Sequence, residues 1–328
     1  MVKIHITFLL LFVFLILTGC LENQETKKNE GGTDETKDED IIDREVVSAN
    51  LTIEDADNEI EITLQEEEDK WGWDGVNNYI VFRNDQFEKA FQTFVEAVSH
   101  AKQLKESTIY FRGDKDIVWQ SSYKSISKII DAPLISQMPE LPRGCEVTSL
   151  AMLLRTSGIS EAKVKKTKLA KEIKRDTTPY RKENGQIYFG NPYDGFVGDM
   201  YSLNTPGYGV YHGPLAELAE QYIPNKVIDM TGSEFEDIMF PVSNGNPVLV
   251  IHNSWFKKLP ESQFQTWNTP TGRVKITMRE HSVLVTGYDE KYIYFNDPLA
   301  NMKNRKVNKK DFIDGWIQMG KQAITYVK

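Results

Sequence analysis

The spacing of hydrophobic residues changes twice along this chain of 328 residues. The first segment holds one unbroken apolar run at residues 8–17, FLLLFVFLIL, followed by a long polar stretch. Between residues 79 and 120 the spacing is helical in one part and strand-like in others. From residue 131 onward helical spacing comes first and strand alternation afterwards. This order predicts an α+β domain with helices packed on an antiparallel sheet, preceded by a small α/β module.

The apolar run near the N-terminus is too short and wrongly flanked for a permanent membrane-spanning helix. Lys3 precedes it, as in a secretory signal, and we assign residues 1–20 to such a signal. The run ends in Leu17-Thr18-Gly19-Cys20, which resembles the bacterial lipobox. An ordinary signal peptide that ends near a cysteine is the alternative. We expect a lipid on Cys20, which would anchor the mature protein to the extracytoplasmic face of the cell membrane.

Residues 21–70 contain 19 acidic and 5 basic side chains, a net charge of −14. Their composition cannot bury enough apolar surface to fold, so we predict a disordered acidic tether. The whole chain has a net charge of −9 and residues 1–20 contribute +1, so residues 71–328 come to about +4. That part has no basic block, which argues against a nucleic-acid partner.

Residues 71–130 predict a small strand–helix–hairpin module. YIVF at 79–82 has the character of a strand, and two alternating segments at 107–113 and 116–120 predict a hairpin. Between them, residues 85–104 have helical spacing, with Asn84 or Asp85 as the cap. The apolar positions of this predicted helix are Phe87, Phe91, Phe94, Val95 and Val98. The module carries no group of residues that suggests chemistry.

The larger domain, residues 131–328, begins with a helix after Gly144-Cys145. Its apolar positions share one helix face: Val147, Leu150, Ala151 and Leu154. Further helices are predicted near 160–174 and from Pro214 to about Tyr222. The later segments predict successive strands: PVLVIHNSW, RVKIT, HSVLVTGY, KYIYF and AITYV.

Cys145 is the one cysteine that remains once Cys20 is set aside. A thiol outside the cytoplasm with no disulfide partner needs an explanation. At the start of a helix, unpaired amides and the positive end of the helix dipole favour a thiolate. The residue is therefore a candidate nucleophile, and a small apolar core residue is the alternative.

A nucleophilic thiolate needs a base, and the base needs an orienting partner. His281 opens a predicted hairpin whose turn is centred between residues 289 and 290. That turn pairs residues whose numbers sum to 579, so His281 would lie opposite Pro298 and next to Asp297. Asn296 becomes the orienting residue if the register slips by one.

A second arrangement is suggested by His252-Asn253-Ser254-Trp255. Asn-Ser-Trp surrounds the orienting asparagine of papain-type peptidases, whose chain order of Cys, His and Asn would make His212 the base. His212 lies in a loop before a helix, with no strand to fix its imidazole, so His281 is the preferred base. His252 is expected at a strand end near the cleft.

Several segments together resemble the peptidase C39-like family, in order and over about residues 133–328. They are ELPRGCEVTSLAMLL, NPYDGFVGDMYS, GYGVYHGPLAELA, NPVLVI, EHSVLVTGYDEKYIYFNDPL and FIDGWIQMGKQAI. The resemblance implies a papain-like cysteine peptidase fold and a triad of Cys145, His281 and Asp297. It also implies that the Gln137 side-chain amide donates to the oxyanion, together with the Cys145 backbone amide.

The sequence departs from the bacteriocin-exporter C39 peptidases, which have a small residue after the cysteine where this chain has Glu146. No transporter span or ATP-binding sequence accompanies the domain. We expect a membrane-anchored cysteine hydrolase that cleaves a peptide or isopeptide bond in a peptide or protein substrate at the cell wall. It would use no metal or cofactor. The alternatives are a binding or scaffold protein without turnover and an amide acyl-transferase of the transglutaminase type.

The lipid anchor gives a first prediction. Globomycin should block maturation of the N-terminus, because it inhibits the peptidase that processes lipidated signals. In Cys20→Ala, maturation should no longer respond to globomycin and the protein should leave the membrane fraction. The measurement is gel mobility and fractionation of the two proteins. Globomycin-insensitive maturation of the unaltered protein would instead indicate an ordinary signal peptide.

Overall fold

The computed structural model describes residues 73–113, 116–124 and 127–328. All of these belong to one contact unit, Thr63–Lys328. The predicted signal, Cys20 and the predicted tether lie outside the described residues. No helix within the described ranges is long and apolar enough to cross a membrane.

The small module is a four-stranded antiparallel sheet with one helix. The strand order is β2-β1-β3-β4. The helix α2 buries Phe94, Ala97, Val98 and Ala101. The elements are β1 (Tyr79–Arg83), β2 (Gln86–Phe91), α2 (Phe94–Ala101), β3 (Ser107–Phe111) and β4 (Ile117–Gln120). The strands at 79–82, 107–113 and 116–120 were therefore predicted correctly.

The predicted helix over 85–104 is wrong in its first half, which forms β2. Asn84 and Asp85 have φ values of 48° and 59°. Two successive residues with positive φ make the tight turn that joins hairpin strands. The helix begins only after Thr93, whose hydroxyl accepts a hydrogen bond from the Glu96 amide. The module is thus hairpin, helix, hairpin.

The main sheet of the larger domain has seven strands and is antiparallel throughout. Six follow the order β10-β17-β11-β14-β15-β16, and β5 pairs with β14. The predicted α+β class is confirmed. The strands are β5 (Lys128–Ile129), β10 (Val227–Asp229), β11 (Val248–Asn253), β14 (Glu280–Tyr288), β15 (Tyr292–Asp297), β16 (Met302–Asn308) and β17 (Ala323–Tyr326).

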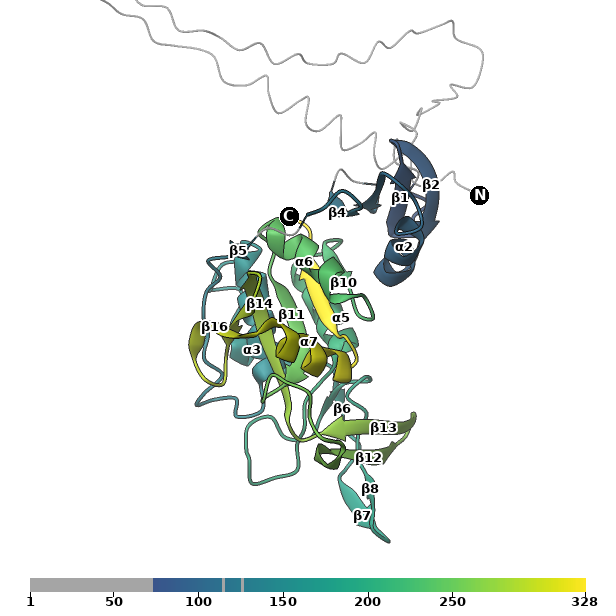
Figure 1. Cartoon of the computed structure of the whole chain (residues 1–328). Coiled ribbons are helices and arrows are strands. Elements are labelled where there is room, and N and C mark those ends of the chain that lie inside the picture. The colour runs from purple at the N-terminus through teal and green to yellow at the C-terminus, as the bar shows by residue number, and fades with distance from the viewer. Residues whose placement is uncertain (1–72, 114–115, 125–126) are drawn as a thin grey trace, which may run out of the picture. The chain divides into compact units, whose positions relative to one another are not determined.

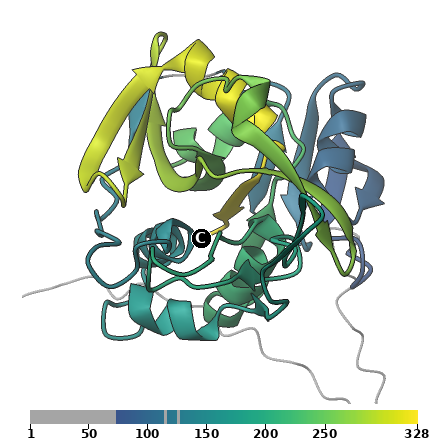
Figure 2. The same cartoon turned by 90° about the horizontal axis from the view of Figure 1, so that it is seen from below.

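Helices cover both faces of this sheet (Figures 1 and 2). One face carries α3, α4 and α5, and the opposite face carries α7. Phe235 of α6 packs edge-on against Phe312 and Trp316 of α7. The helices are α3 (Cys145–Thr156), α4 (Lys166–Glu172), α5 (His212–Tyr222), α6 (Phe235–Ser243) and α7 (Lys309–Gln318). The four apolar positions predicted for α3 are all buried.

The remaining segments form two smaller sheets and a short 3-10 helix. The order in the larger of the two sheets is β13-β12-β8-β7, and β6 pairs with β9 in parallel. Some of these short strands lie within residues 179–213, which are rich in glycine, tyrosine, asparagine and proline. Their bounds are β6 (Arg175–Asp176), β7 (Arg181–Glu183), β8 (Gln186–Tyr188), β9 (Phe196–Val197), η1 (Glu261–Gln263), β12 (Phe264–Thr269) and β13 (Gly272–Thr277).

The β14–β15 register differs from the predicted one. Leu284 pairs with Asn296, a sum of 580 in place of the predicted 579, and a bulge after Val285 shifts the pairing nearer the turn. Continued at 580, the register puts Asp297 opposite Val283. The predicted pairing of His281 with Pro298 is therefore wrong by one residue. Next to the turn the pairs sum to 581, because the turn is centred between residues 290 and 291, and the bulge takes back one residue of that shift.

Asp237 of α6 joins the small module to the larger domain. Its Oδ1 accepts a hydrogen bond from Trp119 Nε1 at 3.0 Å, and its Oδ2 lies 2.7 Å from Lys102 Nζ. Oδ2 also accepts from the Glu234 amide at 3.2 Å, which caps α6. The side chain is 4 % exposed, so these contacts replace water that the carboxylate has lost.

We predict that Asp237→Asn destabilises the protein by about 1–3 kcal/mol, because it removes the charge from these buried bonds. Glu236→Gln, an exposed change in the same helical turn, should stay within about 0.5 kcal/mol of the unaltered protein. Urea unfolding of the three proteins measures the difference. Equal midpoints for the two variants would contradict a stabilising role for Asp237.

Candidate active site

His281 and Asp297 form a buried hydrogen-bonded pair. His281 Nε2 lies 3.0 Å from Asp297 Oδ1, and both residues are at most 2 % exposed. The register explains the contact. Asp297 faces Val283, so it lies diagonally across from His281 on the same face of the sheet. The Phe256 ring packs 5.8 Å from the imidazole.

Asp297 accepts more hydrogen bonds than the one from His281. Arg305 Nη1 donates to Oδ2 at 2.7 Å, and the amides of Leu299 and Ala300 donate to Oδ1 at 3.0 and 3.1 Å. Burial alone would raise the pKa of Asp297, but the His281 bond, the amides and Arg305 together hold that pKa well below its usual range. An ionised Asp297 favours the imidazole tautomer with its proton on Nε2, which leaves Nδ1 as the acceptor.

Asn296, the alternative orienting residue, has other partners. Its Nδ2 donates to the carbonyls of Ala132 and Pro133, both at 3.1 Å, and its Oδ1 accepts from the Asn304 amide at 3.0 Å. Being adjacent to Asp297 in a strand, it points to the opposite face. The structure therefore places Asp297, and not Asn296, against His281.

The other two histidines named in the sequence also have partners of their own. His252 Nε2 lies 2.8 Å from the Phe312 carbonyl, and burial lowers the pKa of His252 to about 4. His212 begins α5, and its Nδ1 lies 2.5 Å from Asp229 Oδ2. Asn253 is bonded within its own turn, with Nδ2 donating to the Lys257 carbonyl. None of these contacts reaches Cys145.

Cys145 is the first residue of α3, as predicted, and is 6 % exposed. Gly144 precedes it as the cap and provides no side chain to bond the first-turn amides. The thiol donates to Glu146 Oε2 at 3.3 Å, and Glu280 Oε2 lies 4.0 Å from Sγ. Across the described ranges, no hydrogen bond joins Cys145 to His281. The structure thus brings His281 to Asp297 and the thiol to two carboxyl groups.

The surroundings of Cys145 oppose ionisation. Burial raises the pKa of the thiol well above its usual value, and the charges of Glu146 and Glu280 raise it further. The helix N-terminus acts in the other direction, but its effect is limited to about 2 kcal/mol even in favourable sites. Burial and the two glutamates therefore oppose the thiolate that the position in the helix favours.

Glu146 and Glu280 are functional candidates that the sequence reasoning missed. Glu146 is fully buried and its Oε1 accepts from the Val210 amide at 2.8 Å; burial raises its pKa to about 7. Burial and the charge of Glu146 raise the pKa of Glu280 well above its usual value. The signal for Glu146 was an acidic residue in the first turn of a helix that is otherwise buried. Glu280 gave no such signal.

Glu280 and His281 are neighbours in β14, so their side chains leave the strand on opposite faces. Glu280 reaches Cys145 on the α3 side. His281 lies beside Phe256, whose ring is stacked on Phe312 of α7. The two halves of the predicted triad therefore approach β14 from different faces at its first residues.

Gln137 is buried at the start of the loop that leads to α3. Its Nε2 donates to the carbonyls of Leu141 and Pro142 at 3.2 and 2.9 Å, and its Oε1 is buried without a partner in the described part of the chain. Its backbone amide donates to the Pro298 carbonyl at 2.9 Å. The side-chain N–H groups thus hold the loop before Cys145, and an oxyanion would compete with these carbonyls for them.

The chain matches known proteins over this domain. The model of the Peptidase_C39 like family matches residues 129–324. The chain belongs to the Peptidase_C39 like family. Protein YvpB of Bacillus subtilis strain 168, which is uncharacterized, is 45% identical over 207 residues, 62% of this chain and 78% of its own length. A crystal structure from Bacillus anthracis assigned to the C39-like peptidases is 47% identical, with a TM-score of 0.57 over 62% of this chain and 98% of that one.

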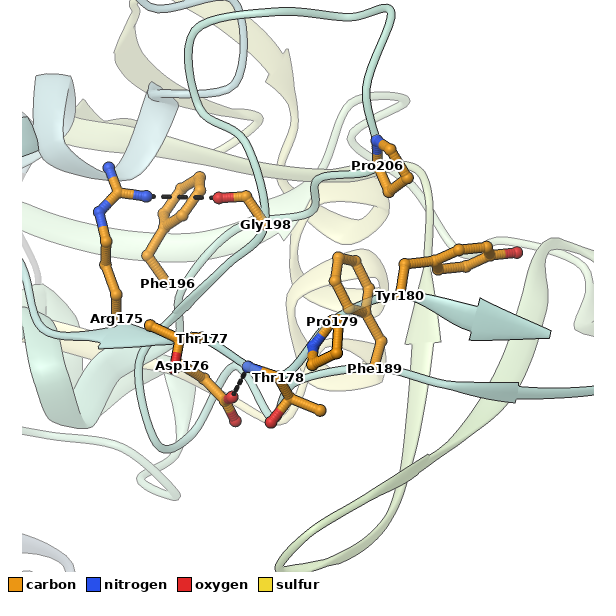
Figure 3. A pocket seen from close by; sticks show the side chains of 10 residues that line it. All are labelled: Arg175, Asp176, Thr177, Thr178, Pro179, Tyr180, Phe189, Phe196, Gly198 and Pro206. Atoms are coloured by element: carbon orange, nitrogen blue, oxygen red, sulfur yellow. Dashed lines mark hydrogen bonds between the residues drawn. The ribbon is translucent and has the colours of Figure 1, made fainter.

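A pocket of about 450 Å³ lies against β6 and β9 of the same domain (Figure 3). Its labelled side chains include several rings. Arg175 and Asp176 at its edge are already engaged, Arg175 with the Gly198 carbonyl and Asp176 with the Thr178 amide. The rings and prolines that line it are Pro179, Tyr180, Phe189, Phe196 and Pro206. Its lining is therefore mainly apolar.

The pocket and the site share one loop. β9 leads from the pocket wall, and the Val197 amide donates to the Gly209 carbonyl at 3.0 Å. The next residue, Val210, donates to Glu146. This loop thus links the strand that borders the pocket to Glu146.

The buried carboxyls give a prediction for stability. A carboxyl whose pKa is raised in the folded state keeps a proton that the unfolded chain releases. The free energy of unfolding therefore falls progressively as pH rises above about 4.5. Glu280→Gln removes this penalty, so it should raise the free energy of unfolding at pH 8 and change it little at pH 4.

Urea unfolding at the two pH values measures this effect. Glu290→Gln, an exposed change in the β14–β15 turn, is the control and should show the same small difference at both. A gain from Glu280→Gln that does not depend on pH would mean that Glu280 is not held protonated by the fold.

Proposed function

We propose that this C39-like protein is a cysteine hydrolase that cleaves a peptide or isopeptide bond with Cys145 as nucleophile, His281 as base and Asp297 as orienting residue. The observation that carries the proposal is the buried His281–Asp297 pair, 3.0 Å apart, on the strands that follow a helix opened by Cys145. Family membership supports a peptidase fold, and the pair supplies an oriented base to it.

The chemistry follows from the atoms that are free. Nδ1 of His281 takes the proton of Cys145. The Nε2–H group stays hydrogen-bonded to Asp297, whose charge stabilises the imidazolium. The thiolate attacks the carbonyl carbon and the amide bond breaks, with the imidazolium giving its proton to the leaving amine. Water then releases the acyl group from the thioester. The Cys145 amide donates to the oxyanion, and Gln137 adds to it once its Nε2 leaves the loop carbonyls.

The first step requires the thiol to turn from Glu146 toward His281. Hydrogen bonds of resting active sites are often long or misaligned and tighten when substrate binds. Because Glu280 and His281 leave β14 on opposite faces, the step requires a rearrangement at the start of that strand as well as a new Cys145 rotamer.

We place the enzyme at the outer face of the cell membrane, held by a lipid on Cys20. A peptide or protein of the cell wall would then be its substrate. The mainly apolar pocket at β6 and β9 fits an apolar side chain of such a peptide better than a charged one.

A protein that keeps this fold without turnover is the second candidate. The observation in its favour is the burial of the thiol beside two carboxyls, which raises its pKa well above the usual value. Acyl transfer to an amine uses the same residues and differs only in what releases the thioester, so a labelled amine that enters the product would identify it.

We predict that Cys145→Ser, His281→Ala and Asp297→Asn each lower turnover by about a hundredfold or more. The measurement is mass spectrometry of new termini after incubation with cell-wall peptides or a peptide library. His212→Ala is the matched control, because His212 is also paired with a carboxylate, and it should retain activity. A loss confined to His212→Ala would transfer the role of base to His212, and no turnover by the unaltered protein in any pool would favour the scaffold.

A further inference from the structure

We propose that Glu146 and Glu280 form a subsite that binds a primary ammonium group of the substrate next to Cys145. This inference rests on the proposed function and adds the substrate class: peptides with an ammonium group a few bonds from the scissile carbonyl. The amine is either the N-terminus of a peptide or the side chain of a diamino acid.

The geometry places acceptors around one point. Cys145 Sγ, a carboxylate oxygen of Glu146 and one of Glu280 all lie within 4.8 Å of one another. Each could therefore contact one small cation lying between them. Glu146 and Glu280 come from different elements, α3 and β14, so the pairing is made by tertiary packing and not by a local turn.

Both carboxyls lack a cationic partner. Neither takes part in an ion pair with a lysine, arginine or histidine of the described ranges. Glu280 Oε1 is shielded from water and has no hydrogen-bond partner there. A buried carboxyl without a partner costs free energy, and a ligand with a positive charge and N–H donors would recover it.

The neighbouring loop is shaped to leave room for this pair. A Cβ at Gly209 would lie 2.1 Å from Glu146 Oε1 and 3.0 Å from Glu280 Oε2. Its backbone is not in the left-handed region, so space is what requires glycine there. The loop thus passes the two carboxyls without a side chain to fill or neutralise the site.

An ammonium group suits the site better than a metal ion. A divalent metal among these three residues would take Cys145 Sγ as a ligand and so occupy the electrons needed for attack. An ammonium group would leave Sγ free. It would also offset the negative charge that opposes ionisation of the thiol, so the correct substrate would activate its own nucleophile.

Three methanethiosulfonates that differ in charge test the inference without a known substrate: the 2-aminoethyl, methyl and 2-sulfonatoethyl reagents. The thiolate attacks the sulfenyl sulfur, forms a mixed disulfide and releases methanesulfinate. Full-length protein is used, and modification is followed by mass spectrometry of the tryptic peptide 144–155, which contains Cys145.

The charge preference is the ratio of the reaction rate with the cationic reagent to that with the anionic reagent. For Cys145 we expect this ratio to be about tenfold or more above that of glutathione, since about 1.4 kcal/mol of attraction gives a factor of ten. Glu280→Gln should reduce that preference toward the value for glutathione and speed the reaction with the neutral reagent. The exposed Glu290→Gln is the control and should match the unaltered protein.

The outcomes separate this inference from the proposed function. Reaction of Cys145 with a charge preference equal to that of glutathione overturns the inference alone. A Cys145 inert to all three reagents, in the unaltered protein and in Glu280→Gln, overturns the nucleophile and the inference with it. Protection of Cys145 by Zn²⁺ that is lost in Glu280→Gln, without any charge preference, would make the pair a metal site and overturn the ammonium assignment.

Discussion

The alternation of side chains along β14 is the constraint on which the rest of the site depends. This strand lies inside the main sheet, between β11 and β15, and every residue from His281 to Tyr288 is buried. A strand covered on both faces cannot shift by one residue without moving each side chain to the wrong layer. The packing of α3 on one face and α7 on the other therefore fixes which groups of β14 meet Cys145 and which meet Asp297.

Three carboxyls near the start of this strand behave differently because their partners differ. Asp297 is buried but accepts from His281, Arg305 and two amides, so it remains charged. Glu146 has one backbone donor, and Glu280 has an oxygen with none in the described ranges. Burial therefore favours their protonated forms. One fold thus holds one carboxyl ionised to orient a base and raises the pKa of two others beside a nucleophile, as sites that separate acid and base roles do.

The sequence was sufficient for features that depend on local periodicity. The helix after Cys145 and the antiparallel strands of the larger domain could be predicted because buried faces repeat at fixed intervals. The pair of His281 and Asp297 was approximately predicted because a hairpin links them. The register was off by one, since the turn is centred one residue later than predicted and the bulge after Val285 offsets only half of the resulting shift.

Tertiary features could not be predicted in this way. Alternation shows that Glu280 and His281 face opposite sides, but not which side α3 occupies. The contact between Glu280 and Cys145 depends on that placement alone. In the small module a helix was predicted because Phe87 and Phe91 fit helical spacing. In the structure Asn84 and Asp85 form a tight turn, and Phe87 and Phe91 belong to the strand that follows it.

The loop through Gly209 explains how recognition and reactivity could be linked in one site. On one side it is bonded to β9, which borders the mainly apolar pocket, and on the other it contacts Glu146. A peptide held in the pocket would press on the same backbone that confines the carboxyl pair. Since Glu146 Oε2 is also the acceptor of the resting thiol, any movement of Glu146 toward a bound cation would release Cys145. The thiol would then no longer be held on the Glu280 face of β14, so occupancy of the site would favour formation of the triad.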